Sequence, residues 1–325
     1  MTRTASLATV SALRPNLLAG LIGVAALGFL TVSYRPIPAA CGRMSIVAGG
    51  QSFPGITAPA QAETRTGGKP IAGGAAGSIV APRPETGQSP LAFHVALLES
   101  ALARLERVPS YTGTLYKQEQ IDGEDVGEVA KIFMKVRHEP FSVYMKWLDD
   151  GGQEVLYVDG QNNGKMLVRA GGWQAMLPII KLDPSGSLAM KAARHPITKA
   201  GLLNLVRTLL DYRHRDLKLS AGVTVARLDD VVFEQRQCYQ FTIVYDASAV
   251  EPVYRKTIVY CDQATALPLY VKCFTWPDET VTTTEADALD EATLLEFYGF
   301  ADLNLATGLS DRDFDQANSS YSFRR

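Results

Sequence analysis

Apolar and polar residues alternate along most of the chain beyond residue 110, which is the pattern of strands that bury one face. Ile132, Met134 and Val136, for example, alternate with Lys131 and Lys135. Turn residues, chiefly Gly and Asp, separate successive segments of this kind. We therefore expect an antiparallel meander that is apolar on one face and largely polar on the other. Its strands are expected at 111–120, 128–138, 141–148, 153–158 and 165–170, then at about 223–235, 238–245, 253–261 and 267–276, with two more near 280–298.

Helical periodicity appears before the strands and again between them. Residues 90–107 carry apolar side chains at helical spacing, after Ser89 as N-cap and Pro90 at the first helical position. A short helix is expected at 187–194 and a longer one after Thr198, where leucines form a stripe. This order predicts an α+β domain in which one curved antiparallel sheet, a half-barrel, is covered by an N-terminal helix and by inserted helices.

The N-terminus carries an uncharged apolar run, residues 17–32, preceded by Arg3 and Arg14. Its length lies between the core of a signal peptide and the roughly 20 residues that span a bilayer. The basic residues predict a cytoplasmic N-terminus with the rest of the chain outside. We expect residues 1–40 to be either a cleaved signal peptide or a retained membrane anchor.

A compositional change follows this segment. Residues 41–89 are dominated by Gly, Ala, Pro, Ser and Thr and are expected to form a disordered linker, because they cannot bury enough apolar surface to order themselves. Cys41 follows Ala39 and Ala40, so it is either an acylated lipoprotein cysteine or an ordinary linker residue. Residues 90–325 are long enough to form a single domain with its own core.

Charge and motifs exclude several functions. With 32 Lys+Arg and 34 Asp+Glu the formal net charge is −2, and neither sign forms a long block, so we expect no nucleic-acid partner. The sequence contains no recognisable motif for nucleotide binding, acyl transfer or zinc proteolysis. The four histidines are scattered without ligand spacing, so we predict no metal site and no cofactor. We expect a protein that is not an enzyme.

Three cysteines lie in expected strands. If 238–245 and 253–261 form a symmetric hairpin, Cys238 faces Cys261, and an oxidising compartment would allow a disulfide between them. The alternative is a pair of buried free thiols, because cysteine is often a small core residue.

One face of the expected sheet is unusually rich in aromatic and large apolar residues. It either packs as ordinary core beneath the helices or forms a pocket for an acyl chain or hydrophobic peptide. The candidate ligand-binding residues are Phe141, Val143, Met145, Trp147, Phe241 and Ile243.

Several short runs in this chain match a known pattern. They are Phe141 to Trp147, Gly152 to Gly160 with Asn163 and Gly164, His195 to Thr198 with Gly201 and Leu202, Asp262 to Pro268, Phe297 to Phe300, and Gly308 to Asp315. On these runs, residues from about 95 to 325 resemble the bacterial family called domain of unknown function 1571. The resemblance implies an envelope compartment and an architecture, but no catalytic residue.

A more distant resemblance concerns the lipoprotein-carrier fold, which includes the periplasmic carrier that sorts lipoproteins to the outer membrane. It rests on the order of helices and strands and on the run from Asp262 to Pro268. The resemblance implies that inserted helices, here about 185–215, shield acyl chains held against the apolar face.

Three hypotheses for function follow. The first is a non-enzymatic exported envelope protein that binds a lipid, a lipoprotein or an apolar peptide on the helix-covered face. The second is a membrane-tethered sensor or scaffold that binds another envelope protein. The third is an envelope hydrolase that uses acidic residues. In each case we expect an exported protein, located in the periplasm and either free or anchored in the inner membrane by its N-terminal segment.

Overall fold

The structure is a computed structural model, and it describes residues 56–57, 79–123, 126–149 and 151–323. The expected signal or anchor, Cys41 and most of the expected linker lie outside these residues. None of the described helices is both long and apolar enough to cross a membrane.

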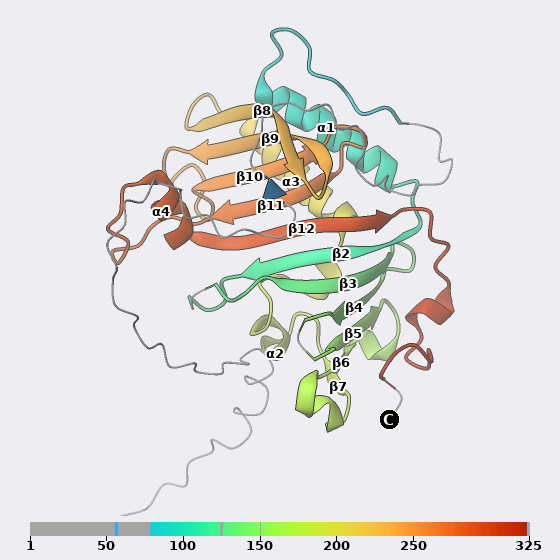
Figure 1. The fold of residues 1–325 in the computed structure, drawn as a ribbon. Helices are drawn as coiled ribbons and strands as arrows, with labels where there is room; N and C mark the ends of the chain where they lie inside the picture. Colours follow the sequence, from blue (N-terminus) through green and yellow to red (C-terminus); the bar gives the residue numbers. More distant parts are fainter. Residues whose placement is uncertain (1–55, 58–78, 124–125, 150, 324–325) are drawn as a thin grey trace, which may run out of the picture. The chain divides into compact units, whose positions relative to one another are not determined.

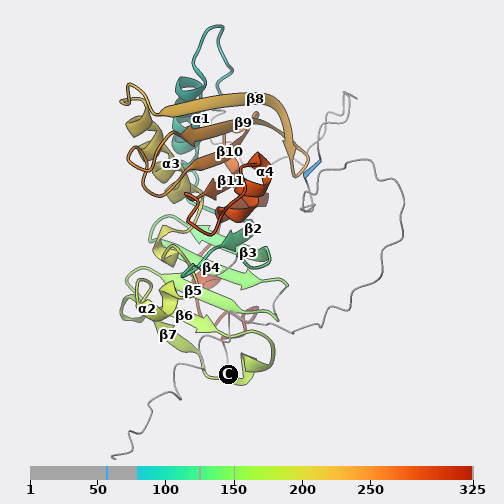
Figure 2. The ribbon, with the colours of Figure 1, turned by 90° about the vertical axis from the view of Figure 1, so that its left-hand side faces the viewer.

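One open sheet runs through the described residues (Figure 1). Its strands are β1 Ile56–Thr57, β2 Ser110–Glu119, β3 Ala130–Arg137, β4 Ser142–Trp147, β5 Glu154–Val158, β6 Met166–Arg169, β7 Ile180–Leu182, β8 Val223–Phe233, β9 Arg236–Tyr245, β10 Lys256–Asp262, β11 Pro268–Phe274 and β12 Leu294–Asn304. Their order across the sheet is β1-β8-β9-β10-β11-β12-β2-β3-β4-β5-β6-β7. Every strand pair is antiparallel, and Figures 1 and 2 show the sheet curved, so the expected α+β class is confirmed.

Along the chain, helices precede β2, lie between later strands and follow β12. They are α1 Pro90–Leu105, α2 Ser187–Met190, α3 Leu202–Asp216 and α4 Ala286–Ala292, with the 3-10 helices η2 Asn162–Gly164, η3 Gly172–Met176, η4 Ile197–Lys199 and η5 Asp311–Phe314. Ser89 caps α1 by accepting a hydrogen bond from the Ala92 amide at 3.2 Å, as the sequence predicts. Figure 2 shows α1 and α3 together on one face of the sheet.

The centre of the sheet joins two meanders that are far apart in the sequence. Strands β2 to β7 form one meander and β8 to β12 the other, and β12 pairs with β2. The expectation of two strands near 280–298 is wrong, because α4 is followed there by the single strand β12. The helix forms from Ala, Leu, Asp and Glu, which favour helix or its first turn over strand, and the threonines before it are largely exposed.

The C-terminal segment buries the second face of the β4–β6 region. Its aromatic residues form a small core with the outward side chains of those strands, and the Tyr144 and Tyr321 rings stack at 3.9 Å. The members of this core are Tyr144, Leu156, Val158, Leu167, Phe314, Tyr321 and Phe323. All five residues of β5 are consequently buried, which corrects the expectation that the second face is largely polar.

The expected register of the cysteine hairpin is wrong by one residue. Cys261 pairs with Tyr239, and Cys238 pairs with Asp262. Because side chains alternate along a strand, this register directs the two thiols to opposite faces of the sheet. Cys238, Cys261 and Cys273 are buried free thiols in the structure, which is the alternative to the disulfide. Burial raises the pKa of all three thiols, so they stay protonated.

The C-terminal core can be tested at Phe314, whose side chain is 2% exposed. We expect Phe314→Ala to lower the free energy of unfolding by about 3 kcal/mol, because it removes apolar contacts and leaves a cavity. Urea denaturation followed by tyrosine and tryptophan fluorescence measures this. Leu228→Ala, at a side chain 57% exposed, is the matched control and should change stability by less than about 0.5 kcal/mol. Equal stability of the two variants would contradict a core in the C-terminal segment.

Candidate functional site

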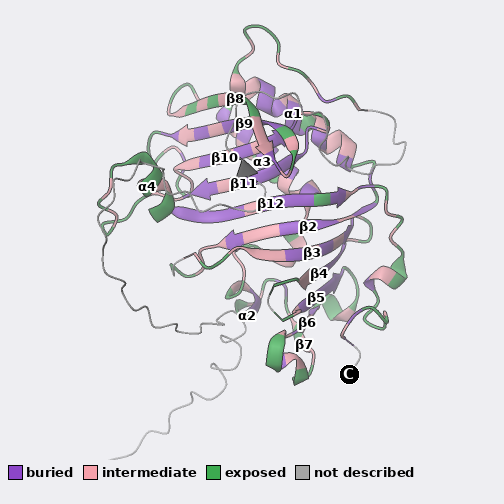
Figure 3. Cartoon of the chain, in the orientation of Figure 1, coloured by how far each residue is buried: buried purple, intermediate pink, exposed green. Residues whose placement is uncertain are grey.

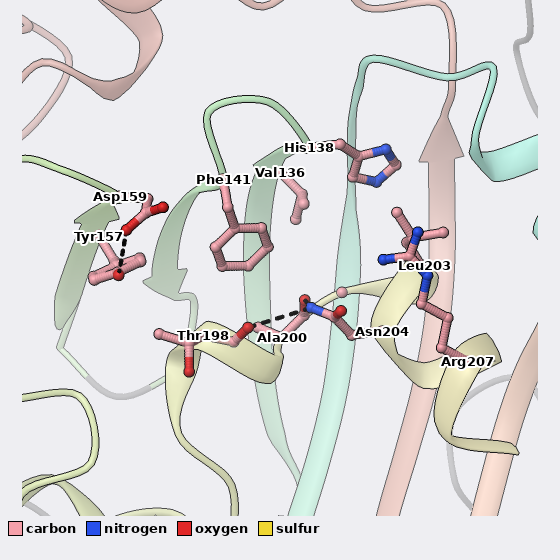
Figure 4. A pocket seen from close by; sticks show the side chains of 11 residues that line it. Val136, His138, Phe141, Tyr157, Asp159, Thr198, Ala200, Leu203, Asn204 and Arg207 are labelled. Atoms are coloured by element: carbon pink, nitrogen blue, oxygen red, sulfur yellow. Dashed lines mark hydrogen bonds between the residues drawn. The ribbon is translucent and has the colours of Figure 1, made fainter. Parts of the chain in front are cut away.

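A cleft of about 350 Å³ lies between strand ends of the first meander and the segment that enters α3 (Figure 4). The strand side consists of side chains from the end of β3, the turn before β4 and the end of β5. The helix side consists of η4 and the first two turns of α3. The lining residues are Val136, His138, Phe141, Tyr157 and Asp159 on the strand side, and Thr198, Ala200, Gly201, Leu203, Asn204 and Arg207 on the helix side.

The helix side is held in place by Gly201 and Tyr111. Gly201 has φ +97°, and a Cβ there would lie 2.8 Å from the Tyr111 hydroxyl oxygen, so only glycine fits. The N-cap residue of α3, Gly201, has no side chain to cap the helix; instead the fully buried Tyr111 hydroxyl accepts a hydrogen bond from the Leu202 amide at 2.7 Å. Burial raises the pKa of Tyr111, which therefore remains a neutral hydroxyl. The start of α3 is thus fixed against β2 and β3.

The cleft is polar at both ends and apolar between them. Figure 4 shows Asp159 and Tyr157 at one end and His138 and Arg207 toward the other, with the Phe141 ring and Val136 between them, facing η4 and Ala200. Burial lowers the pKa of His138, which favours the neutral imidazole, and its Nε2 has no hydrogen-bond partner among the described residues.

Arg207 supplies the positive charge of this polar end. Its guanidinium lies 3.5 Å from the Glu106 carboxylate, and both side chains are half exposed. An exposed ion pair of this kind contributes little to stability, so the guanidinium is available to an anionic group at little cost. The arrangement suits an amphipathic molecule better than a wholly apolar one.

Preceding η4, a buried cluster of ionisable groups attaches the inserted segment to the centre of the sheet. Glu296 of β12 is paired with Glu119 of β2 in the register, and both side chains are at most 5% exposed. Glu296 accepts hydrogen bonds from His195 Nε2 at 2.9 Å and Arg194 Nε at 3.2 Å. Glu119 accepts one from the Arg194 amide at 3.0 Å and pairs with Lys117 at 3.0 Å. The two opposed carboxylates are therefore stabilised by Arg194, His195 and Lys117, and the first two of these belong to one segment.

The cluster shifts the acidity of its members. The hydrogen bond that His195 donates to Glu296 raises the pKa of His195 despite partial burial. Burial works to raise the pKa of Glu296, but hydrogen bonds from His195 and Tyr254 and the charge of Arg194 outweigh it, so the pKa is lowered. Tyr254 and Tyr298 also donate hydrogen bonds to these carboxylates, which completes their solvation by the protein.

The structure separates the six residues predicted to bind a ligand. Phe141 lines the cleft, whereas Val143 and Met145 are buried in the core and Trp147 is half-buried against it. Phe241 lies beneath α1, stacked on the His94 ring at 4.3 Å, and Ile243 is fully buried on the same strand.

Most of the cleft residues were not predicted individually. The runs His195 to Thr198 and Gly201 to Leu202, which carried the family resemblance, were the one signal that could have located its helix side. Among the described residues, no group of three or more His, Cys, Asp or Glu side chains could hold a metal ion.

Comparison with known proteins identifies the family. The family model described as protein of unknown function (DUF1571) matches residues 108–323, which is more than half of the chain. This chain belongs to that family. The predicted family membership is confirmed, and no curated protein matches the sequence.

Several solved structures are similar at low identity. The MucA/MucB complex of Pseudomonas aeruginosa gives a TM-score of 0.38 at 17% identity, covering 69% of this chain and 62% of that one. Lipoprotein LppX of Mycobacterium tuberculosis gives 0.37 at 12% identity, covering 67% and 98%. A putative outer membrane lipoprotein-sorting protein domain from Vibrio parahaemolyticus gives 0.24 at 14% identity, covering 67% and 96%. All three TM-scores lie below 0.5, so these likenesses assign no ligand or activity to this chain.

The attachment of the inserted segment can be tested through the pH dependence of His195→Gln. A histidine whose pKa is raised by folding stabilises the protein below its unfolded value of about 6.5, and this contribution is lost as pH rises through the folded value. The variant should therefore lose more stability near pH 6 than near pH 8, as measured by urea denaturation at both values. Leu228→Ala, at an exposed side chain that carries no titrating group, is the control and should show no such difference. A pH-independent loss at His195 would contradict its pairing with Glu296.

Proposed function

We propose that this protein is a non-catalytic component of the bacterial cell envelope that binds a lipid or lipid-modified protein through the cleft between β3–β5 and α3. The ligand would be amphipathic. An acyl chain would lie against Phe141, Val136 and Leu203, and its polar head would lie at Arg207 and His138. The observation that carries the proposal is that one cleft combines an apolar middle with a basic end formed by Arg207 and His138, while Asp159 lies at the opposite end.

The apolar middle of the cleft supports the binding of a hydrocarbon chain. The whole cleft has a volume of about 350 Å³, which falls at the lower end of the range of small-molecule sites, about 300–1,000 Å³. Each methylene removed from water contributes about 0.8 kcal/mol. A partly enclosed chain could therefore be held reversibly, as a carrier requires.

The polar end supports an anionic or hydroxyl-bearing head group. Arginine binds carboxylate and phosphate through paired hydrogen bonds. Envelope location rests on the N-terminal charge and apolar pattern, which predicts export to the periplasm with the segment either cleaved or kept as an inner-membrane anchor.

A fluorescent fatty acid tests the cleft. The full-length chain can be titrated with cis-parinaric acid. We expect saturable binding that weakens by at least about tenfold in Ala200→Trp, which fills the cleft, and in Phe141→Asp, which places a charge in its apolar wall. Arg207→Gln should weaken the binding of a fatty acid more than the binding of its methyl ester, because only the acid carries a negative charge.

Leu228→Asp, at an exposed leucine on β8, is the control and should bind as the unchanged protein does. Near-UV circular dichroism checks that each variant is folded. Undiminished binding in folded Ala200→Trp and Phe141→Asp would contradict the proposed cleft. Absence of binding, together with a mass free of co-purified lipid for protein taken from a bacterial envelope, would favour a tethered sensor or scaffold.

A further inference from the structure

The buried side of α1 carries a histidine whose ring nitrogens are not hydrogen-bonded. His94 is fully buried, and its ring is stacked on Phe241 of β9 at 4.3 Å with an interplanar angle of 4°. Neither ring nitrogen has a hydrogen-bond partner among the described residues. Figure 3 shows buried residues along α1 where it lies beside β8 and β9. A buried polar ring without a hydrogen bond costs free energy, so its presence in this core needs an explanation.

The ionised groups next to His94 balance one another without it. Arg213 of α3 is 2% exposed and forms an ion pair with Asp216 at 2.9 Å. Arg215 lies 3.3 Å from Asp216 and 2.5 Å from Glu251. Two cations are thus matched by two carboxylates. A positive charge on His94 would exceed this balance inside the core, where an uncompensated charge is strongly unfavourable.

The other polar groups around His94 do not compensate a positive charge on its ring. Tyr245 of β9 is hydrogen-bonded to both members of the buried ion pair on α3, and burial raises its pKa, so it stays neutral. Arg227 of β8 lies over the Phe93 ring at 5.2 Å and is itself a cation. His214 and Glu99 connect α3 and α1 at 3.6 Å, but both side chains are about half exposed, so water screens their attraction.

The surroundings of His94 make the packing of α1 sensitive to pH. Burial and the charge of Arg213 both lower the pKa of His94, so the packed helix carries a neutral imidazole. A state in which α1 has opened and His94 reaches water binds a proton more readily, with an ordinary pKa of about 6.5. Protonation therefore favours the open state, and the packed state loses stability as pH falls below that value.

We propose that α1 is a pH-sensitive cover that opens from the sheet on acidification, when His94 gains a proton beside Arg213. The helix supplies no strand, so its opening breaks no pairing between the strands. It would uncover Phe241 and also Tyr239, whose ring lies 5.1 Å from that of Phe93. The cleft lies between β3–β5 and α3, so this opening does not rest on the proposed ligand.

Hydrogen exchange of the full-length chain at pH 7 and pH 5, followed by mass spectrometry, tests the proposal. Rates are compared as protection factors, which correct for the intrinsic pH dependence of exchange. The protection of Pro90–Leu105 should fall by about 25-fold between the two pH values, because protonation of a solvated histidine favours the open state by that factor. Strands β2 and β3 should keep higher protection than α1 at pH 5, since they stay paired while the helix is open.

His94→Phe keeps an aromatic ring against Phe241 but cannot take up a proton, so it should remove most of the fall in α1. If near-UV circular dichroism shows that this variant does not fold, His94→Leu repeats the test with a smaller neutral side chain. Leu102→Ala, at a partly buried leucine of α1, is the matched control. It should lower the protection of α1 at both pH values and leave the 25-fold difference between them unchanged.

Two results would overturn the proposal. One is an equal fall in the unchanged chain and in a folded His94 variant, which would assign the pH dependence to other groups. The other is equal protection of α1 and of β2 and β3 at pH 5, which would mean that the domain opens only as a whole.

Discussion

The arrangement of the domain depends on two carboxylates that oppose each other at the centre of the sheet. Pairing β12 with β2 brings Glu296 beside Glu119 in the interior, where neither can be solvated by water. Buried like charges are tolerated only when cations and hydrogen-bond donors surround them. Arg194 and His195 supply much of that compensation, so the inserted segment has to cross the sheet at this point. The cleft forms where the same segment continues past Gly201 into α3.

The elements of this fold were largely predictable because each depends on local periodicity. The helix at Pro90–Leu105 has its cap and its stripe in its own sequence, and so do most of the strands. Which segment covers each part of the sheet was not predictable. Alternation shows that Phe141 and Phe241 share the buried side of their strands, but it does not show that α1 covers one while the other borders a cleft. What covers a side chain is decided by segments more than 40 residues away.

Contacts between segments that are distant in the sequence also explain the remaining errors in the predictions made from the sequence. The sequence alone predicts that the second face of β5 is exposed to solvent. Phe314 and Tyr321 fold back onto this face, and these residues have no regular spacing that would predict the contact. The cysteine hairpin was placed by symmetry, whereas the register leaves Cys238 opposite Asp262. That carboxylate is fixed by Arg236, whose guanidinium donates to both of its oxygens at 2.8 Å. This ion pair at the strand end accompanies the observed register, which differs by one residue from the register inferred from an assumed loop length.

The position of β12 bears on how the chain reaches its native state. It lies in the middle of the sheet, yet it is the last strand in the sequence, and Tyr298 contacts Glu119 across 179 positions. Strand β2 cannot pair with β12 until nearly the whole polypeptide is available, so the two meanders cannot join before then. Such topology gives slow folding, because chain entropy is lost before distant contacts form. A chain in which β12, beginning at Leu294, is not yet available would therefore lack the strand that joins its two meanders, and its fold would stay incomplete until that strand is made.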